Sequence, residues 1–186
     1  MGGPKALVEL EGEPLVRRGI ALLAGAGCDP VVVVVGAAAS EVELWCEGAK
    51  VVVAADWDLG MGASLRAGLA ALARTPSSAC VVALVDQPLV TGEAVERLVS
   101  SAAGGAVAAV ATYDGRQRNP VLLDRSVWLG VAAAAVGDAG ARAWLRDHPH
   151  LVVEVDCSDA GSPDDVDTPE DLAALIDPHL RREGSR

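Results

Sequence analysis

Phenylalanine is absent from this sequence, and aromatic residues make up only 3% of the chain. A buried core must therefore be built mainly from Ala, Val and Leu. Positive charge is also scarce, because 15 Lys and Arg residues stand against 26 Asp and Glu residues, for a formal net charge of −11. This balance argues against a nucleic-acid surface, which needs a basic stripe. An acidic enzyme of anionic substrates must supply local positive charge from a few Lys or Arg side chains, helix N-termini or a divalent metal.

Closely spaced cysteines are missing too, which leaves neither a CxxC redox pair nor a zinc-binding pattern. We expect buried apolar thiols, a usage that suits a reducing cytoplasm, at Cys28, Cys46, Cys80 and Cys157. No signal peptide is visible, and no apolar run approaches the length of a membrane span. The three histidines lie near expected helix ends or in the tail, and we assign them no catalytic role.

What the sequence does contain is an alternation of apolar β-branched runs with helical patterns. The runs predict strands, of which the first three are expected to be buried on both faces, over 30–36, 50–56, 80–86, 106–113, 119–124 and 150–156. Apolar spacing and N-caps such as Thr91 and Thr168 predict helices, over 13–27, 40–48, 63–74, 91–103, 125–136, 140–149 and 168–180. A polar turn is expected over 114–118.

This alternation predicts an α/β, Rossmann-like fold with a mostly parallel sheet and helices on both faces. The length of 186 residues fits one domain, over 1–180, followed by a polar tail over 181–186 that we expect to be flexible. Ligands of such sheets bind beyond the carboxyl ends of the strands. That rule selects the loops "MGGPK", "WDLGMGAS", "DQP" and the segment before "TPEDL".

Two of these loops carry glycine beside a possible ligand-binding side chain. In "GGPK" the glycines let backbone N–H groups approach phosphate oxygens, and Lys5 can reach the phosphates as a mobile point charge. The alternative is a flexible start to the chain, and the loop is not a Walker A motif. In "GMGAS" the hydroxyl of Ser64 lies in the first turn of a helix, where it either binds a ligand or only caps the helix.

The other two loops carry carboxylates. Asp86 ends a predicted strand at the ligand edge, and Mg²⁺ takes one or two carboxylates plus substrate phosphates. Asp165 and Asp167 are separated only by Val166, so alternation could aim both toward the same side. The alternatives are a turn cap for the first residue, and loop solvation plus capping for the other two.

Taken in order, these motifs resemble the MobA-like nucleotidyltransferases, most closely the molybdenum cofactor cytidylyltransferase branch. "MGGPKAL" is similar to the second half of the family loop L-A-A-G-x-S-x-R-M-G-x-x-K. "GMGASLRAGL", "VDQPLV", "GDAGARAWL" and "DVDTPEDL" follow in family order, so the resemblance covers nearly the whole chain. It implies a fold of the nucleotide-diphospho-sugar transferase type.

The resemblance also implies roles for individual residues. Lys5 and Asp86 would be catalytic, with Lys5 stabilising charge on the phosphates and Asp86 as the principal Mg²⁺ ligand; Asp165 is favoured over Asp167 for the second metal or ribose contact. The implied nucleotide-binding residues are Gly2, Gly3, Lys5, Gly62 and Ser64. A weaker inference assigns substrate binding to Asn119, Asp138, Arg142 and Asp167.

Two departures from the family pattern bear on these expectations. Arg118 stands where the family has glycine before Asn-Pro or His-Pro. The first strand of the family and its "LAAG" turn do not precede "MGGPK". We therefore expect a natural chain that starts upstream by a strand and a loop, on the order of 15 residues. That strand would be central, so its two neighbours would present open edges without it.

The expected reaction is transfer of CMP from CTP to molybdopterin, with Mg²⁺ as cofactor and release of pyrophosphate. "DQP" leans toward the cytidylyl branch over the guanylyl branch, so GTP stays an alternative to CTP. A molybdenum hydroxylase is a possible partner, whereas nucleic acid and membranes are not expected to be. Two other functions stay open: a nucleotidyltransferase with another acceptor, such as a sugar phosphate or an isoprenoid precursor, and a non-catalytic accessory protein that binds molybdenum cofactor.

Overall fold

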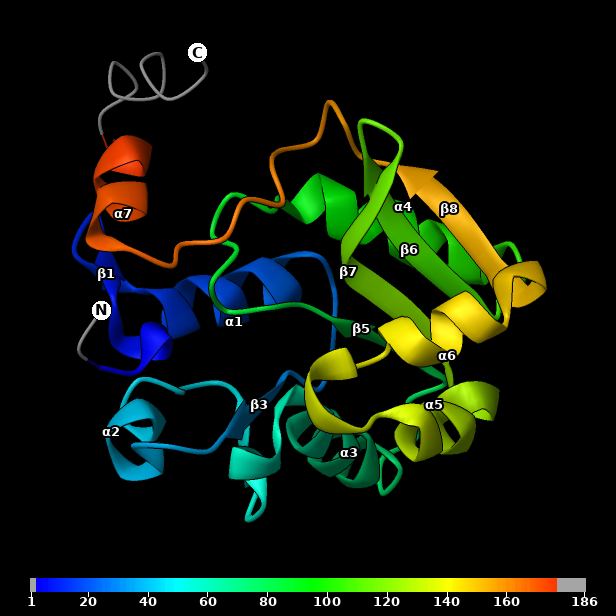
Figure 1. Cartoon of the computed structure of the whole chain (residues 1–186), viewed down its shortest axis with the longest axis horizontal. Helices are drawn as coiled ribbons and strands as arrows, with labels where there is room; N and C mark the ends of the chain where they lie inside the picture. The colour runs from blue at the N-terminus through cyan, green and yellow to red at the C-terminus, as the bar shows by residue number, and fades with distance from the viewer. Residues whose placement is uncertain (1–2, 177–186) are drawn as a thin grey trace.

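A four-stranded sheet and a separate pair of strands form the framework of residues 3–176, which the computed structural model describes (Figure 1). The larger sheet has the order β5–β7–β6–β8, with bounds Ala79–Val82, Arg116–Asp124, Ala108–Tyr113 and Val152–Asp156. The separate pair is parallel and consists of β3 (Val32–Val35) and β4 (Lys50–Val53). A short antiparallel pair near the start of the chain consists of β1 (Glu9–Leu10) and β2 (Glu13–Pro14).

The expectation of a mostly parallel sheet holds for β5, β6 and β8, which run in one direction, but β7 runs antiparallel to both of its neighbours, β5 and β6, so the sheet is mixed. The cause is a two-residue hairpin turn between β6 and β7. Asp114 and Gly115 both have positive φ, 51° and 71°, as a type I′ turn requires. The predicted polar turn over 114–118 is thus too long, since residues 116–118 already belong to β7.

The expected helices are present, and the α/β class with helices on both sides of the sheet is confirmed. The α-helices α1 to α7 cover Leu15–Gly25, Ala39–Glu43, Met61–Leu72, Gly92–Ala103, Trp128–Ala134, Arg142–Asp147 and Pro169–Ile176. Short 3-10 helices cover Lys5–Leu7, Trp57–Leu59, Arg125–Val127, Gly137–Ala139 and Pro149–Leu151. The predicted tail 181–186, and the end of the helix expected over 168–180, lie outside the described residues.

Both faces of β6 are covered, and all six of its residues are buried. Ala108 and Val110 pack with residues of α3, α5 and α6, whereas Ala109 and Ala111 pack with residues of α4. Alternate side chains of a strand point to opposite faces, so one small-residue strand serves two layers. The core contains no Phe, and its space is filled in two other ways. The helices pack closely on the short side chains of β6, and Trp128 supplies a large aromatic side chain.

The first three expected strands are less buried than the sequence predicts. In β3 only Val35 is buried, β5 is half-buried throughout, and Lys50 and Val53 of β4 are exposed. The reason is that each of these strands pairs on one side only. β5 also ends at Val82, so Asp86 lies in a turn beyond the strand rather than at its last position.

The predicted N-caps are confirmed. Thr91 Oγ1 accepts a hydrogen bond from Ala94 N at 3.4 Å, and Thr168 Oγ1 accepts one from Asp171 N at 3.1 Å. The expectation of buried cysteines holds only in part, because Cys46 and Cys157 are buried while Cys28 and Cys80 are half-buried; all four are free. No helix among residues 3–176 is long and apolar enough to cross a membrane.

Candidate functional site

The ammonium group of Lys5 lies between two carboxylates from distant parts of the chain. Its Nζ donates to Asp86 Oδ2 at 2.7 Å and also to Asp167 Oδ1. Lys5 starts the first 3-10 helix, Asp86 lies in the turn after β5, and Asp167 precedes α7. Three segments that are up to 162 residues apart thus meet at one cation.

These contacts keep Lys5 charged. Partial burial lowers the pKa of Lys5, but the hydrogen bonds to Asp167 and Asp86 outweigh it and raise the pKa above its ordinary value. The side chains of Lys5 and Asp167 stay substantially exposed, while that of Asp86 is 20% exposed. A phosphate group or a hydrated cation can therefore reach the cluster from solvent.

Asp165 has a different partner from Asp167. It accepts a hydrogen bond from Gln87 Nε2 at 2.8 Å, and the same nitrogen contacts Pro163 O at 3.0 Å. The backbone ties the two segments as well, because Val166 N donates to Asp86 O at 2.8 Å. The acidic segment before α7 is thereby held beside the turn that carries Asp86.

A cavity of about 580 Å³ begins beside this cluster and extends between β3 and β5. Several residues assigned from the sequence line it together, namely Ser64, Asn119, Arg142 and Asp165. A second, polar hollow of about 610 Å³ adjoins it and is lined by Tyr113, Arg116, Ser158 and Asp164 among others. Arg118 and Asp165 line both, so the two cavities meet at these side chains.

Gln87 lies in the selected loop "DQP" and lines the cavity, although no site role of its own was predicted for it. It is 6% exposed, and its Oε1 has no hydrogen-bond partner among the described residues. A buried acceptor without a donor is uncommon and costs free energy. A ligand in the cavity can supply that donor. The available signal was the position of Gln87 directly after Asp86.

Arg118 and Asn119 reach the cavity because β7 is irregular there. Ala111 of β6 pairs with Arg118 and Val110 pairs with Val121, so Asn119 and Pro120 form a bulge without partners. Bulges change the direction in which side chains point and often lie beside active sites. The Arg118 side chain is exposed and donates only to its neighbour Gln117 O, at 3.1 Å, among the described residues.

Gly62 and Asp138 hold the start of α3 in place. A Cβ on Gly62 would lie 2.5 Å from Ala135 O, so only glycine allows this close approach. Asp138 Oδ1 accepts a hydrogen bond from Met61 N at 3.3 Å. These contacts position Ser64, in the first turn of α3, at the cavity wall. Within the structure, Gly62 and Asp138 thus support the site rather than line it.

The glycines of the first loop are less informative. Gly3 is exposed and has open space around it. Gly2 lies outside the described residues. The predicted phosphate-binding loop is therefore represented by Lys5 and its contacts.

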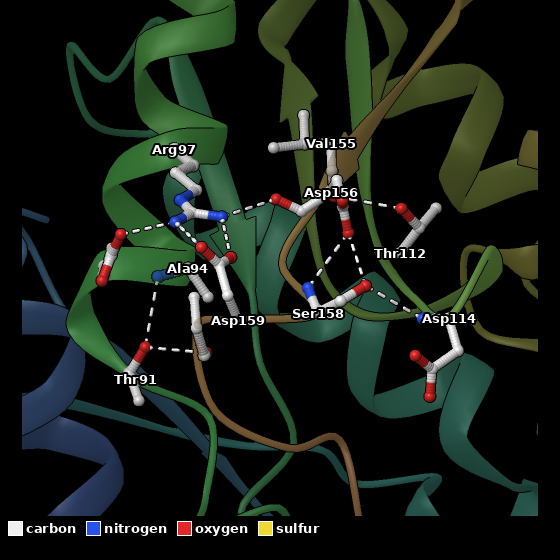
Figure 2. A network of polar contacts seen from close by, with 11 residues as sticks. Thr91, Ala94, Arg97, Thr112, Asp114, Val155, Asp156, Ser158 and Asp159 are labelled. Atoms are coloured by element: carbon white, nitrogen blue, oxygen red, sulfur yellow. Dashed lines mark hydrogen bonds and ion pairs between the residues drawn. The ribbon is translucent and has the colours of Figure 1, made fainter.

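A second polar network anchors the segment that leads to the acidic residues (Figure 2). Arg97 of α4 donates to Asp159 Oδ1 at 2.6 Å and to Asp156 O at 2.8 Å. Thr91 Oγ1 donates to Ala160 O at 2.9 Å. Residues 156–160 are thus fixed to α4, which constrains where Asp165 and Asp167 emerge.

The Lys5 cluster fits a divalent cation. No group of three or more His, Cys, Asp or Glu side chains that could hold a metal converges within residues 3–176. Two carboxylates converge at one cation, however, and this is the protein donor set that Mg²⁺ or Mn²⁺ needs when water and substrate phosphates complete its shell. The ammonium of Lys5 shows that the site stabilises positive charge.

The model of the family described as "MobA-like NTP transferase domain" matches residues 1–152. A nicotine blue oxidoreductase from Paenarthrobacter nicotinovorans is 40% identical over 182 residues, which covers 94% of this chain and 88% of that protein.

Two mycobacterial structures are also similar. The homologue of Mycobacterium tuberculosis Rv0371c from Mycobacterium sp. strain JC1 is 30% identical, with a TM-score of 0.82 over 98% of this chain and 90% of that one. Rv0371c from M. tuberculosis H37Rv, solved as a manganese complex, is 28% identical, with a TM-score of 0.76 over 93% and 91%. Solved structures that are 14 to 19% identical include a nucleotidyl transferase and show the shared nucleotide-diphospho-sugar transferase fold alone.

Proposed function

The chain belongs to the family of MobA-like NTP transferase domains and is a nucleotidyltransferase, and we propose that it transfers CMP from CTP to molybdopterin with release of pyrophosphate. The observation that carries the proposal is the meeting of Lys5, Asp86 and Asp167 beside a cavity, whose lining includes the chain neighbours Val85, Gln87 and Asp165. A charged triphosphate needs a cation there, and the overall net charge of −11 makes this local positive charge important for binding.

In the proposed reaction, a terminal phosphate oxygen of the acceptor attacks the α-phosphorus of CTP. A new P–O bond forms, the bond to the bridging oxygen breaks, and pyrophosphate leaves. No protein nucleophile is needed, so the side chains align the substrates and stabilise charge. Lys5 donates to the phosphates as negative charge builds on the leaving pyrophosphate.

Asp86 and Asp167 would hold a divalent cation such as Mg²⁺. That cation, when bound, neutralises triphosphate charge and orients the phosphates for in-line attack. We favour Asp167 over Asp165 for the second carboxylate because Asp167 shares Lys5 with Asp86, whereas Asp165 accepts from Gln87. The manganese complex of a related mycobacterial protein supports a divalent metal in this fold.

The two cavities suit two substrates. We assign the nucleoside of CTP to the wall formed by Ser64 and Gln87, because Gln87 Oε1 has no donor within the described part of the chain. An amino group of a nucleobase would supply one. We assign the acceptor to the side of Asn119 and Arg142, with Arg118 where the two hollows meet. An exposed guanidinium with no acidic partner among residues 3–176 suits a phosphorylated acceptor.

Pyrophosphate release tests the proposal directly. The purified chain is incubated with Mg²⁺ and CTP, GTP or ATP, each with molybdopterin, a sugar phosphate or an isoprenoid precursor phosphate. Release with CTP and molybdopterin above every other pair supports the proposal. Release with another acceptor redirects it to that substrate. Retained binding of molybdopterin without release for any nucleotide favours the accessory role in maturation of a molybdenum hydroxylase.

A second candidate function comes from the curated relative. Because a protein 40% identical over 94% of this chain is named nicotine blue oxidoreductase, reduction of a dye of that kind is a specific alternative. The same protein preparation is assayed with nicotine blue and NADH or NADPH. The alternative is favoured if the dye loses its colour only when the protein is present, and if Asp86→Asn bleaches it at the same rate. Dye reduction requires no triphosphate site, so this substitution should not slow it.

A further inference from the structure

The polar hollow of about 610 Å³ beside the candidate site lies between the β6–β7 hairpin and the loop that follows β8. The hairpin lines it with residues between 113 and 118, and the loop lines it with residues between 158 and 165. This volume falls within the range of small-molecule pockets, about 300–1,000 Å³, and is much larger than a single inorganic ion. The hollow therefore has room for an organic molecule.

Both walls of the hollow are held in place by contacts of their own. Ser158 Oγ accepts a hydrogen bond from Asp114 N at 3.0 Å, which ties the loop to the hairpin turn (Figure 2). Further along the loop, Ser162 N donates to Leu89 O at 3.1 Å. Gly161 comes so close to Leu89 O that a Cβ would collide with it. A pocket that is already formed loses less conformational freedom when a ligand binds.

Two arginines line the hollow from one face of β7. Arg116 and Arg118 point the same way because alternate residues of a strand share a face. Gln117, between them, lies on the other face and donates to Glu154 Oε1 at 2.8 Å. Two residues of a strand span about 7 Å, so the two guanidinium groups can converge on one phosphate.

These arginines are free to bind a ligand. Neither Arg116 nor Arg118 forms an ion pair with a carboxylate within residues 3–176. The net charge of −11 repels anions from most of the surface, so two unpaired cations in one hollow provide a local binding place for a phosphate. Arg118 stands where the family pattern has glycine, so this pair is a feature of the chain rather than of the family.

The rest of the hollow is rich in hydrogen-bond acceptors. The carboxylates of Asp114, Asp164 and Asp165 belong to lining residues, as do the hydroxyl groups of Ser158 and Ser162. A bare phosphate ion would meet three carboxylates as well as two arginines, which makes it a poor occupant. A molecule with an anionic group at one end and hydroxyl or amino donors along its body fits both parts of the lining.

We propose that the hollow binds the body of the phosphorylated acceptor, and that Arg116 and Arg118 together bind its phosphate where the hollow meets the cavity. Arg118 and Asp165 line both spaces, so a phosphate at this junction faces the nucleotide side. The acceptor is then a phosphate ester whose body carries hydroxyl or amino groups, rather than an alkyl phosphate. Its role as acceptor rests on the proposed function, whereas its binding in the hollow does not.

A titration followed by NMR locates binding without turnover. Proton–nitrogen spectra of the purified chain, without metal or nucleotide, are recorded with glucose 6-phosphate, hexyl phosphate, inorganic phosphate and glucose. The side-chain Nε–H signals of Arg116 and Arg118 and the amide signals of residues 158–164 report on the hollow. The amide signals of Lys5 and Asp86 report on the candidate metal site.

We expect glucose 6-phosphate to shift the signals of the hollow along a saturating curve and to bind about tenfold or more tightly than hexyl phosphate or inorganic phosphate. Glucose alone should leave the two arginine signals in place. Equal affinity for hexyl phosphate would overturn the polar body of the ligand. Equal affinity for inorganic phosphate would assign the hollow to a free ion and overturn the ester. Shifts confined to Lys5 and Asp86 would overturn the site itself.

A matched pair of variants tests the arginines. Arg116→Gln should weaken binding of glucose 6-phosphate about tenfold or more, because one of two charged donors is lost. Arg74→Gln is the control, since Arg74 is exposed and lines neither space, and the change in charge is the same. Equal affinities in the two variants would reject the arginine pair.

Turnover separates the failure of this site from the failure of the reaction. In the pyrophosphate assay, Arg116→Gln should raise the KM for the acceptor about tenfold and leave the KM for CTP unchanged. An equal rise in both KM values would contradict a role confined to the acceptor. Retained binding in the hollow without pyrophosphate release for any pair of substrates would contradict the nucleotidyl transfer and leave the ester site in place.

Discussion

Lys5 Nζ lies 2.7 Å from Asp86 Oδ2, across 81 residues of sequence, and this ion pair joins the start of the chain to the turn after β5. Asp167 adds a second carboxylate from the far end. The site therefore depends on three segments that only the folded chain brings together.

Asp86→Asn should lower the rate of pyrophosphate release about 10²–10³-fold, because a neutral amide neither holds a divalent cation nor neutralises Lys5. Single-turnover rates at saturating Mg²⁺ measure the effect. Asp58→Asn is the control, since Asp58 is exposed and lies outside the cluster. Equal rates for the two variants would remove Asp86 from the metal site.

Asp165→Asn and Asp167→Asn should have different effects. Asp167 shares Lys5 with Asp86, so Asp167→Asn should raise the Mg²⁺ or Mn²⁺ concentration needed for half-maximal activity. Asp165 bonds to Gln87, so Asp165→Asn should mainly raise the KM for nucleotide. Metal titrations at fixed nucleotide, and nucleotide titrations at saturating metal, separate the two. If only Asp165→Asn raises the metal concentration needed for half-maximal activity, Asp165 is the second metal ligand, as the sequence favours.

Lys5→Met should reduce stability at neutral pH, and the loss should vary with pH in a defined direction. The pKa of Lys5 is raised in the folded protein, where hydrogen bonds to Asp167 and Asp86 outweigh burial. A raised pKa contributes stability fully below the unfolded value, about 10.4, and loses it as pH rises toward the folded value. Urea unfolding should therefore show a constant difference from pH 7 to 9 that shrinks only in stronger alkali. A difference that shrinks near pH 7 would contradict the ion-pair geometry.

Gly62→Ala should destabilise the protein by about 1–3 kcal/mol, because the new methyl group would lie 2.5 Å from Ala135 O. The nearest atoms belong to the backbone of Ala135 and Gly137, which cannot move aside as a flexible side chain could. Gly92→Ala is the matched control at the start of α4, where nothing lies within 4 Å. Chemical denaturation of the two variants gives the comparison, and similar midpoints would show that the α3 start is not closely packed on this loop.

Asp159→Asn should remove part of the acid sensitivity of the fold. Hydrogen bonds from Arg97 lower the pKa of Asp159 below its ordinary value. A lowered pKa contributes stability above the unfolded value, about 3.9, which is lost as pH falls through the folded value. The difference in Tm between wild type and variant should thus be largest near pH 6 and disappear in strong acid. If the Tm difference stays constant from pH 6 down to strong acid, the ion pair between Arg97 and Asp159 does not cause the acid sensitivity.

The sequence predicted the elements well where local patterns are strong. Periodicity located the helices, and Thr91 and Thr168 marked two helix starts, because capping acts within three or four residues. The antiparallel course of β7 was missed although "DG" is a hairpin signal, since the apolar run that follows fits a parallel strand equally well. Pairing depends on partners that are distant in sequence.

The candidate site divides in the same way. The sequence by itself determined which residue types could bind a triphosphate, since Lys5, Ser64, Asp86, Asp165 and Asp167 stand in loops or in a first helical turn, at places that strand and helix boundaries mark out. Only the tertiary structure decided that Asp167 shares Lys5 with Asp86, that Asp165 accepts from Gln87, and that Gly62 serves packing. The physical reason is range: propensities and caps act between near neighbours, whereas ion pairs and cavities arise between segments that touch only after the sheet and its helices have packed.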